Sequence, residues 1–432
     1  MNFNTPEYLV FLPVVAILHA ILPQKRRWAL LLAASWLFYF SWEPLAGALL
    51  VLTTLVSWLC ALGVGRARGS AAKRALAALA IAFSLGLLAV FKYSGFFAPQ
   101  LGLKILLPVG ISFYTFQTLS YVIDVYRGKI EPERHFGYYA LFVSFFPQLV
   151  AGPIERPDKL LPQLRAERRI AKSDLIDGGA LLLRGYFKKT VLADTIAPCV
   201  DPIFASPEAA GALSVLVGAA LFGLQIYCDF SGYTDIARGS ARLLGVELTE
   251  NFDRPYSARS VRGFWRRWHM SLTSWFTDYV YIPLGGNRKG RARQIVNTLA
   301  VFLLSGLWHG AGWGFVVWGL IHGALISLEI LTGRRAGRLG TFALVSLAWI
   351  FFRAPSISDA LTLFSRLISG WESFALPTGI AGALCAAAAL FALDRNSKPS
   401  PIATFAMALT LGLSALALLG SGGGNAFIYF QF

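Results

Sequence analysis

The chain has 432 residues, of which 56% are hydrophobic and only 14% charged, and its mean hydropathy is +0.58. This composition excludes an ordinary soluble enzyme and is typical of a protein embedded in a bilayer. The formal net charge of +16 would suggest nucleic acid as the partner of a soluble protein. Here the basic residues lie in short loops between apolar runs, as the positive-inside rule expects, so we expect no nucleic-acid partner.

Apolar runs recur along the whole chain, and about a dozen of them are long enough, or nearly so, to cross a bilayer. We expect each run to form a transmembrane or re-entrant helix, which gives an all-α, polytopic integral membrane protein. The first run is read as a retained span. The runs fall near residues 8–22, 28–41, 43–62, 75–97, 105–126, 136–150, 212–230, 294–308, 313–331, 339–352, 377–393 and 402–420.

Loop charges alternate along the first half of the chain. The loops at 25–27, 66–74 and 127–134 are basic, whereas those at 41–44 and 98–104 are nearly bare. The positive-inside rule then places the N-terminus outside the cytoplasm, and a last inner loop at 394–398 places the C-terminus outside as well.

A longer polar stretch, 155–189, is expected to form structure at the cytoplasmic surface, including interfacial helix. Headgroup contact and binding of an anionic substrate both remain open for it. We expect one integral membrane domain, made of N-terminal spans (1–104), a motif-bearing core (105–323) and C-terminal spans (324–432). Lipid is thus the first predicted partner.

Three of the five histidines fall between residues 264 and 322, each beside tryptophan or glycine. Gly306, Gly310 and Gly314 are spaced four apart around His309, and small residues at this spacing let helix backbones approach closely in membranes. We therefore expect His309 to be buried in the turn of a helical hairpin. An imidazole is the natural group to move a proton near neutral pH.

The segment 262–276 is predicted to be one amphipathic helix, because Trp265, Trp268 and His269 share a face while Arg262 and Arg266 share another. An interfacial anchor would carry the same pattern. His322 is expected to have a structural or supporting role. His19 and His135 have no expected role in chemistry.

Acidic residues at or near a membrane segment are costly unless they are paired or face water, so Asp229 and Asp235 are site candidates. A structural pairing with an arginine remains the alternative. The candidate substrate- or donor-binding residues are Arg266, Arg267, Trp268, Asp229, Tyr233, Asp235 and Trp308. The four cysteines are scattered, so neither a disulfide nor a metal site is predicted.

Six stretches together resemble the membrane-bound O-acyltransferases, or MBOAT family. The resemblance is strongest to the bacterial branch that serves alginate O-acetylation and D-alanyl transfer to teichoic acid, and the ending FIYFQF fits the alginate type. The stretches are LPVGISFYTFQTLSYVIDVYRG (107–128), FVSFFPQLVAGPIER (142–156), QIYCDFSGYTDIARG (225–239), NFDRPYSARSVRGFWRRWHMSL (251–272), YIPLGGNRKG (281–290) and GLWHGAGWGFVVWGLIHG (306–323).

This resemblance implies helices around a central tunnel, with the essential histidine of the WHG motif at His309 and a second polar position at His269. It also implies transfer of an acyl group from a cytoplasmic thioester, here acetyl-CoA, to a polysaccharide outside the membrane. No tightly bound cofactor is expected. A separate extracytoplasmic O-acetyltransferase or polysaccharide-modifying protein is the implied partner.

Acyl transfer to a hydroxyl needs a base, and we predict that His309 is that base. His269 would hold the imidazole tautomer or polarise the carbonyl, and a covalent acyl-histidine relay remains open. Basic residues including Arg266, Arg267, Arg288 and Lys289 can bind phosphates of coenzyme A. A polysaccharide transporter or flippase and a non-catalytic assembly scaffold are the rival functions.

Overall fold

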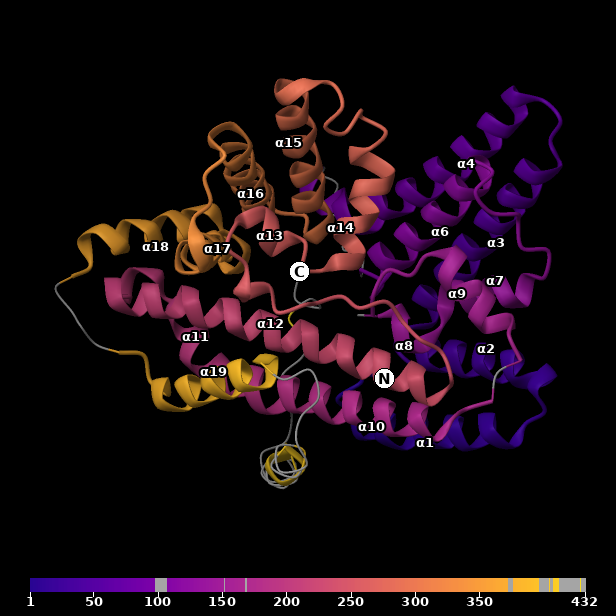
Figure 1. Cartoon of the computed structure of the whole chain (residues 1–432), viewed down its shortest axis with the longest axis horizontal. Coiled ribbons are helices and arrows are strands. Elements are labelled where there is room, and N and C mark those ends of the chain that lie inside the picture. Colours follow the sequence, from indigo (N-terminus) through magenta and orange to yellow (C-terminus); the bar gives the residue numbers. More distant parts are fainter. Residues whose placement is uncertain are drawn as a thin grey trace. The chain divides into compact units, whose positions relative to one another are not determined.

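The computed structural model describes residues 1–97, 107–150, 152–167, 169–371, 376–395, 404, 407–411 and 428. In this part of the chain the regular structure is helical and contains no strand (Figure 1). The all-α prediction is therefore confirmed. The chain divides into two compact units, Met1–Leu182 with Tyr233–Thr249 and Leu183–Gly232 with Glu250–Phe432. The subdivision at residues 104 and 323 stays a prediction.

The first unit contains most of the helices predicted for the first half of the chain, with ends that agree to within a few residues. The single span predicted at 136–150 is instead two short helices, Phe136–Ser144 and Phe146–Leu149, separated at Phe145. Proline near the first position helps to start α1, α3 and α9, because its missing N–H has no partner there in any case. The helices are α1 (Pro6–Ile21), α2 (Gln24–Phe40), α3 (Pro44–Arg66), α4 (Ser70–Leu88), η1 (Ala89–Tyr93), α5 (Ser94–Phe97), α6 (Ile111–Tyr126), α7 (Phe136–Ser144), α8 (Phe146–Leu149) and α9 (Pro157–Arg165).

Two helices, α10 (Lys172–Tyr186) and α12 (Ala212–Leu243), have residues in both units. The second unit carries the histidine-rich stretch. Its other helices are η3 (Phe187–Ala193), α11 (Asp194–Ala205), η4 (Pro207–Ala209), η5 (Pro255–Ser257), α13 (Val261–Trp265), α14 (Met270–Phe276), η6 (Thr277–Tyr281), α15 (Gly290–His309), α16 (Trp313–Thr332), α17 (Gly337–Arg353), α18 (Ile357–Ser369) and α19 (Ile380–Arg395).

Four helical stretches among the described residues are long and apolar enough to cross a membrane. They are Pro44–Arg66, Ser70–Phe97, Ala212–Leu243 and Trp313–Thr332, and shorter apolar helices occur at Pro6–Ile21 and Ile380–Asp394. The chain is thus a multi-pass membrane protein. The predicted span at 402–420 and the ending FIYFQF lie outside the described residues, apart from a few single positions.

The hairpin of α15 and α16 is the closest helix pair in the second unit (Figure 1). A Cβ on Gly306 would lie 2.3 Å from the carbonyl oxygen of Phe315, and one on Gly319 would lie 2.3 Å from that of Phe302. Only glycine allows backbones to approach this closely, as the four-residue spacing predicted. The expected hairpin around His309 is therefore confirmed.

Candidate functional site

His309 ends α15, and the Gly310–Gly312 turn follows it. Its ring is 4% exposed and is enclosed by aromatic rings of the same unit. The ring centroids of Trp308 and Trp318 lie 5.0 Å away, and that of Phe352 lies 5.4 Å away. The histidine is thus held in a compact aromatic cage at the turn of the hairpin.

The prediction of one continuous helix over 262–276 is wrong. Helix α13 ends at Trp265, α14 begins at Met270, and His269 takes a left-handed conformation with φ of +45°. The helix is interrupted because the backbone around His269 forms hydrogen bonds with the segment 251–253. The N–H of Met270 donates to the carbonyl of Asn251 at 2.9 Å, and the carbonyl of Arg267 accepts from the N–H of Asp253 at 3.0 Å.

A non-glycine residue in the left-handed region costs about 1–3 kcal/mol, and such residues cluster at functional sites. Here the conformation turns the His269 side chain into the core, where it is fully buried. The edge of the Phe230 ring packs against it with centroids 4.8 Å apart. His269 is therefore a buried, fixed ring and not part of an exposed helix face.

The Asn251 side chain fixes the proton on His269. Asn251 Oδ1 accepts from the backbone N–H of Ser271 at 3.2 Å and from its hydroxyl at 2.9 Å, so the amide atom on this side is the oxygen. His269 Nδ1 lies 3.1 Å from the same oxygen and must donate to it. In the neutral ring Nε2 then carries the lone pair.

The rings of His269 and His309 are neighbours, with centroids 6.5 Å apart. Trp308 contacts both, at 5.8 Å from His269 and 5.0 Å from His309. Two buried imidazoles on separate elements thus share one aromatic wall. The structure brings together the two histidines that the sequence placed in different motifs.

His322 occupies a different position in the same unit. Trp265 Nε1 donates a hydrogen bond to His322 Nδ1 at 3.2 Å. The Trp318 ring packs against His322 on one side, at 5.1 Å, and against His309 on the other, at 5.0 Å. His322 therefore packs against the cage through Trp318 and Trp265.

A cavity of about 370 Å³ runs beside this cluster and is lined by α14, η6, α15 and the end of α13. Arg262 and Arg266 lie in its wall, as do Trp265 and Phe302. Ser305 also lines it and precedes His309 by one helical turn, so it lies on the same face of α15. The lining contains neither His309 nor His269, and on α15 it reaches as far as Ser305, one turn before His309.

A second cavity, of about 620 Å³, shares Arg262 and Arg266 with the first. Its charged lining is almost entirely basic, with Glu329 as the acidic exception. Glu329 accepts the backbone N–H groups of Val261 and Arg262 at 2.6 and 3.2 Å, and so fixes the start of α13. The other arginines of the lining are Arg259, Arg267, Arg334, Arg335 and Arg338.

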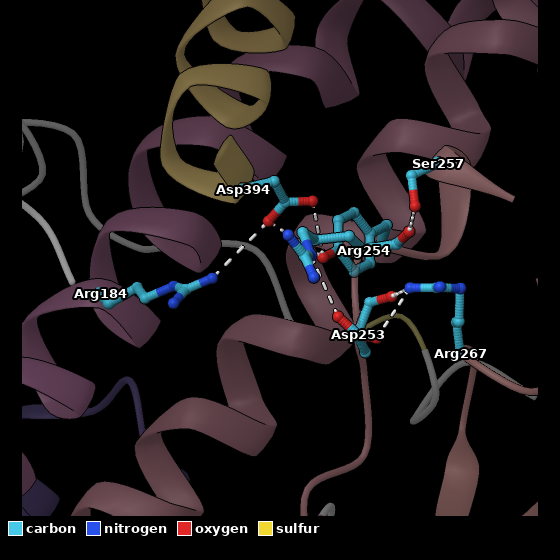
Figure 2. A network of polar contacts seen from close by, with 7 residues as sticks. Arg184, Asp253, Arg254, Ser257, Arg267 and Asp394 are labelled. Atoms are coloured by element: carbon cyan, nitrogen blue, oxygen red, sulfur yellow. Dashed lines mark hydrogen bonds and ion pairs between the residues drawn. The ribbon is translucent and has the colours of Figure 1, made fainter. Parts of the chain in front are cut away.

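Two residues predicted to bind the donor have mainly structural contacts. Arg267 donates to the Asp253 carboxylate at 2.8 Å, and Asp253 also pairs with Arg254 (Figure 2). Trp268 is fully buried among aromatic rings, including the Phe264 ring at 5.3 Å. Arg267 thus braces the turn that carries His269, while also lining the basic cavity.

The remaining predicted residues have partners other than the two histidines. Asp229 is buried in α12, where it pairs with Lys189 at 2.7 Å and accepts the backbone N–H of Ile428 at 2.9 Å. Lys189 was expected at the surface, but it is 1% exposed, because the Asp229 and Asp194 carboxylates compensate its charge.

Tyr233 and Asp235 belong to the first unit. The Tyr233 hydroxyl donates to Asn4 Oδ1 at 3.1 Å, and Asp235 lies 4.0 Å from Arg238. A structural pairing is thus present at both acidic residues, with Arg238 at Asp235 as expected and with Lys189 in place of an arginine at Asp229.

Sequence reasoning missed Asn251, Trp318 and Phe352. Asn251 stands in the NFDRPYS run used for the family resemblance, and a buried amide beside an aromatic cluster was the available signal. Trp318 and Phe352 are apolar residues in apolar helices, so their place beside His309 had no sequence signal. Only packing brings them to the site.

Comparison with known proteins identifies the family of the chain. The model of the membrane-bound O-acyltransferase family matches residues 134–353. The chain is 35% identical to the probable alginate O-acetylase AlgI of Pseudomonas putida, over 100% of both chains. It is 33% identical to the peptidoglycan O-acetyltransferase of Helicobacter pylori, over 85% of this chain and 79% of that protein.

A more distant relative is the teichoic acid D-alanyltransferase of Bacillus subtilis, which is 27% identical over 51% of this chain and 58% of that protein. The resemblance seen in the sequence motifs is therefore confirmed. The chain belongs to the membrane-bound O-acyltransferase family and is an O-acyltransferase.

Proposed function

We propose that this enzyme moves an acetyl group from cytoplasmic acetyl-CoA toward the hydroxyl of an extracytoplasmic polysaccharide, with His309 as the catalytic base. The observation that carries the proposal is the pair of buried imidazoles, 6.5 Å apart, at the turn of the α15–α16 hairpin. The names of the relatives, an alginate O-acetylase and a peptidoglycan O-acetyltransferase, support acetyl as the group and a polysaccharide as the acceptor.

The reaction requires one proton to move to His309 and then from His309 to the leaving group. The acceptor oxygen attacks the thioester carbonyl while His309 takes the hydroxyl proton. The carbon–sulfur bond then breaks, and the imidazolium returns the proton to the leaving thiolate. General-base catalysis contributes about 10²- to 10⁴-fold, and burial in the cage keeps water from competing for the acyl group.

His269 is proposed to position the reacting groups. Because its Nδ1–H is directed at Asn251, the neutral ring offers a lone pair at Nε2. That nitrogen accepts a proton or a hydrogen bond and has none to donate to an oxyanion. Two roles are expected for His269, namely holding the tautomer of His309 and polarising the carbonyl. The ring fits the first role better than the second, and its Nε2 lone pair is also suited to hold the acceptor hydroxyl.

The two cavities that share Arg262 and Arg266 suit the donor. Coenzyme A carries phosphates at one end and a long, mostly apolar arm that ends in the thioester. The arginine-lined cavity offers guanidinium groups, which bind phosphate in bidentate fashion. The 370 Å³ cavity offers an aromatic channel toward the Ser305 face of α15.

The sidedness of the reaction follows from the same charges. Arg288 and Lys289 precede α15, and Arg334 and Arg335 follow α16, so both open ends of the hairpin are basic. Under the positive-inside rule these ends face the cytoplasm and the turn with His309 points away from it. We propose a bacterial inner-membrane location with both termini outside, and an extracytoplasmic polysaccharide-modifying protein as partner.

The test is acetyl transfer by the purified protein in lipid nanodiscs, followed as release of free coenzyme A from acetyl-CoA in the presence of acceptor polysaccharide. His309→Ala is expected to lower the rate by at least about 10²-fold. Because the lost ring leaves a space in the aromatic cage, the melting temperature of the variant is measured and rates are compared per folded molecule. His135→Ala, at a histidine of the first unit, serves as the control. Normal turnover by well-folded His309→Ala protein would contradict the role of His309 as the catalytic base.

The same assay, run against donor concentration, examines the donor cavity. Arg266→Gln removes a cation that both cavities share, so KM for acetyl-CoA should rise about tenfold with a smaller effect on kcat. Arg291→Gln removes an equal charge from the start of α15 outside both linings. Equal KM values for the two variants would contradict donor binding at this cavity.

A further inference from the structure

A small cavity in the first unit is not used by the proposed reaction. It encloses about 140 Å³. Its walls are the end of α1, the first turn of α2, Tyr138 of α7, the end of α9 and the loop 244–246. All these residues belong to the first unit, so the cavity is complete within it.

The cavity is positively charged. Lys25, Arg27 and Arg165 line it, and Glu167 is the acidic residue of the lining. Because Arg165 pairs with the Glu133 carboxylate, Lys25 and Arg27 are the cations that an anion would meet. The lining also includes Gln24, where the 17-residue helix α2 begins. A helix start carries a partial positive charge and N–H groups without intrahelical partners. Charge and dipole therefore both favour an anion here.

A buried histidine provides a second and independent indication. His19 lies on the inward face of α1, is 5% exposed and lines the cavity. Among the described residues no group hydrogen-bonds its Nδ1. An unsatisfied buried nitrogen costs about 1–3 kcal/mol, and an oxygen-rich ligand in the cavity would remove that cost.

The walls are held in place before any ligand binds. Arg27 donates to the carbonyls of Leu22 and Ala20 at 3.1 and 3.4 Å, which fixes its side chain at the end of α1. Gln163 exchanges two hydrogen bonds with the backbone of Glu247, at 3.0 and 2.9 Å, and so anchors the loop at 244–246. Such preorganisation lowers the entropic cost of binding.

The surroundings favour a lipid as the carrier of the anion. Val10, Val14, Ile17 and Ile21 form an exposed apolar stripe along α1, with exposures of 49% to 74%. The stripe lies on the face of α1 opposite His19 and ends at Ile21, at the same end of the helix as the cavity. The Trp28 and Tyr138 rings, 5.4 Å apart, line the cavity. Tryptophan and tyrosine concentrate at the headgroup level of a bilayer. Acyl chains beside this stripe would bring a headgroup phosphate to the cavity.

We propose that this cavity binds a phosphate group, and that a membrane phospholipid with an anionic headgroup supplies it. The same chemistry would accept soluble phosphate, which lacks the acyl chains that the α1 stripe would contact. The elements that line this cavity differ from those that line the two donor cavities. Its failure would leave the proposed acyl transfer unaffected.

The test compares Lys25→Gln with Arg26→Gln in the full-length protein. Both side chains are exposed and adjacent, and both changes remove one positive charge, but only Lys25 lines the cavity. Native mass spectrometry in detergent would measure retention of added phosphatidylglycerol. Lys25→Gln is expected to weaken retention about fivefold, the effect of one cation at a membrane surface, while Arg26→Gln stays at the parent value.

Two further arms identify the source of the phosphate. His19→Leu removes the ring nitrogen without changing charge and should also weaken lipid retention. Thermal unfolding with millimolar inorganic phosphate and no added lipid measures the soluble ligand. Protection that depends on Lys25 in that arm alone would assign the site to soluble phosphate. If the Lys25→Gln and Arg26→Gln proteins behave alike in both arms, the proposal is wrong.

Discussion

A single amide decides the chemistry available to His269. Asn251 is 18 residues away in the sequence, yet its side-chain oxygen accepts from Nδ1 of the ring and from both donors of Ser271. The backbone N–H of Ser271 can only donate, so the three contacts determine which amide atom faces the ring. The lone pair of His269 is therefore placed at Nε2 by a neighbour and not by the imidazole itself.

Asn251→Ala should reduce acetyl transfer at least about tenfold, because His269 loses the acceptor that sets its tautomer and orientation. The change also leaves buried donors unsatisfied, at about 1–3 kcal/mol of stability. Asn251→Asp retains an oxygen at this position and should keep more activity than the alanine variant. The measurement is kcat and KM for both variants, with apparent melting temperatures.

A purely structural role for Asn251 would predict a different pattern. Activity per folded molecule would then stay at the parent value in both variants, and only the melting temperature would fall. Such a result would mean that the hydrogen bond from His269 to Asn251 does not position His269 for catalysis.

At the scale of elements, two features have opposite origins. The α15–α16 hairpin follows from local sequence, because glycines four apart permit the close contact seen at Gly306 and Gly319. The break between α13 and α14 runs against local sequence, since 262–276 has helical periodicity throughout. There the 251–253 segment pairs with the backbone of 267–270, and those hydrogen bonds replace the helical ones.

Gly319→Ala should destabilise the hairpin by about 1–3 kcal/mol, because the new methyl group would lie 2.3 Å from the carbonyl oxygen of Phe302. Gly86→Ala in α4 is the matched control, since nothing lies within 4 Å of the corresponding Cβ. Alanine favours a helix over glycine by up to about 1 kcal/mol, so the control should be neutral or slightly stabilised.

Thermal unfolding in detergent would compare the two glycine variants, and acetyl transfer would show whether the hairpin turn still presents His309. Equal melting temperatures for Gly319→Ala and Gly86→Ala would mean that the backbones can separate at no cost. The close packing of α15 and α16 would then not be what positions the cage around His309.

At the scale of the whole molecule, two buried charged side chains, Lys189 and Glu155, find polar partners within their own units. Lys189 lies between two carboxylates in the second unit. In the first unit the Glu155 carboxylate, which is 1% exposed, accepts from the Thr249 N–H at 2.5 Å and from its hydroxyl at 3.0 Å. Glu155 lies between α8 and α9, outside the helices that can span the membrane.

Burial raises the pKa of Glu155 from 4.5 to about 7, although the hydrogen bonds from Thr249 oppose the shift. The folded protein thus holds a proton that the unfolded chain releases. This contribution to stability is complete below pH 4.5 and is lost as the pH rises through about 7, by up to about 3 kcal/mol. The apparent melting temperature should therefore decline between pH 5 and 8.

Glu155→Gln keeps an acceptor for Thr249 and cannot titrate, so its melting temperature should vary less across the same pH range. Melting curves of the parent and of this variant, collected at matched ionic strength, provide the measurement. Parallel curves for the two proteins would show that another group controls the pH dependence.

The sequence by itself determined the all-α class, most helix positions and the burial of His309 at a glycine-lined turn. Each of these features depends on the length of an apolar run or on residue spacing within one element. Both are properties of the local sequence of a helix. Five candidates were chosen from residue type and position along the chain, namely Arg267, Trp268, Asp229, Tyr233 and Asp235. Their charge or ring was visible in the sequence, but their partners were not.

The contacts that these side chains make depend on the tertiary structure. It broke the expected helix before His269, fixed that ring through Asn251, and placed Trp318 between His309 and His322. It also turned Lys189 inward to Asp229. These outcomes depend on contacts between residues far apart in the chain. No local period encodes them, because the free energy of such a contact exists only once both elements have packed.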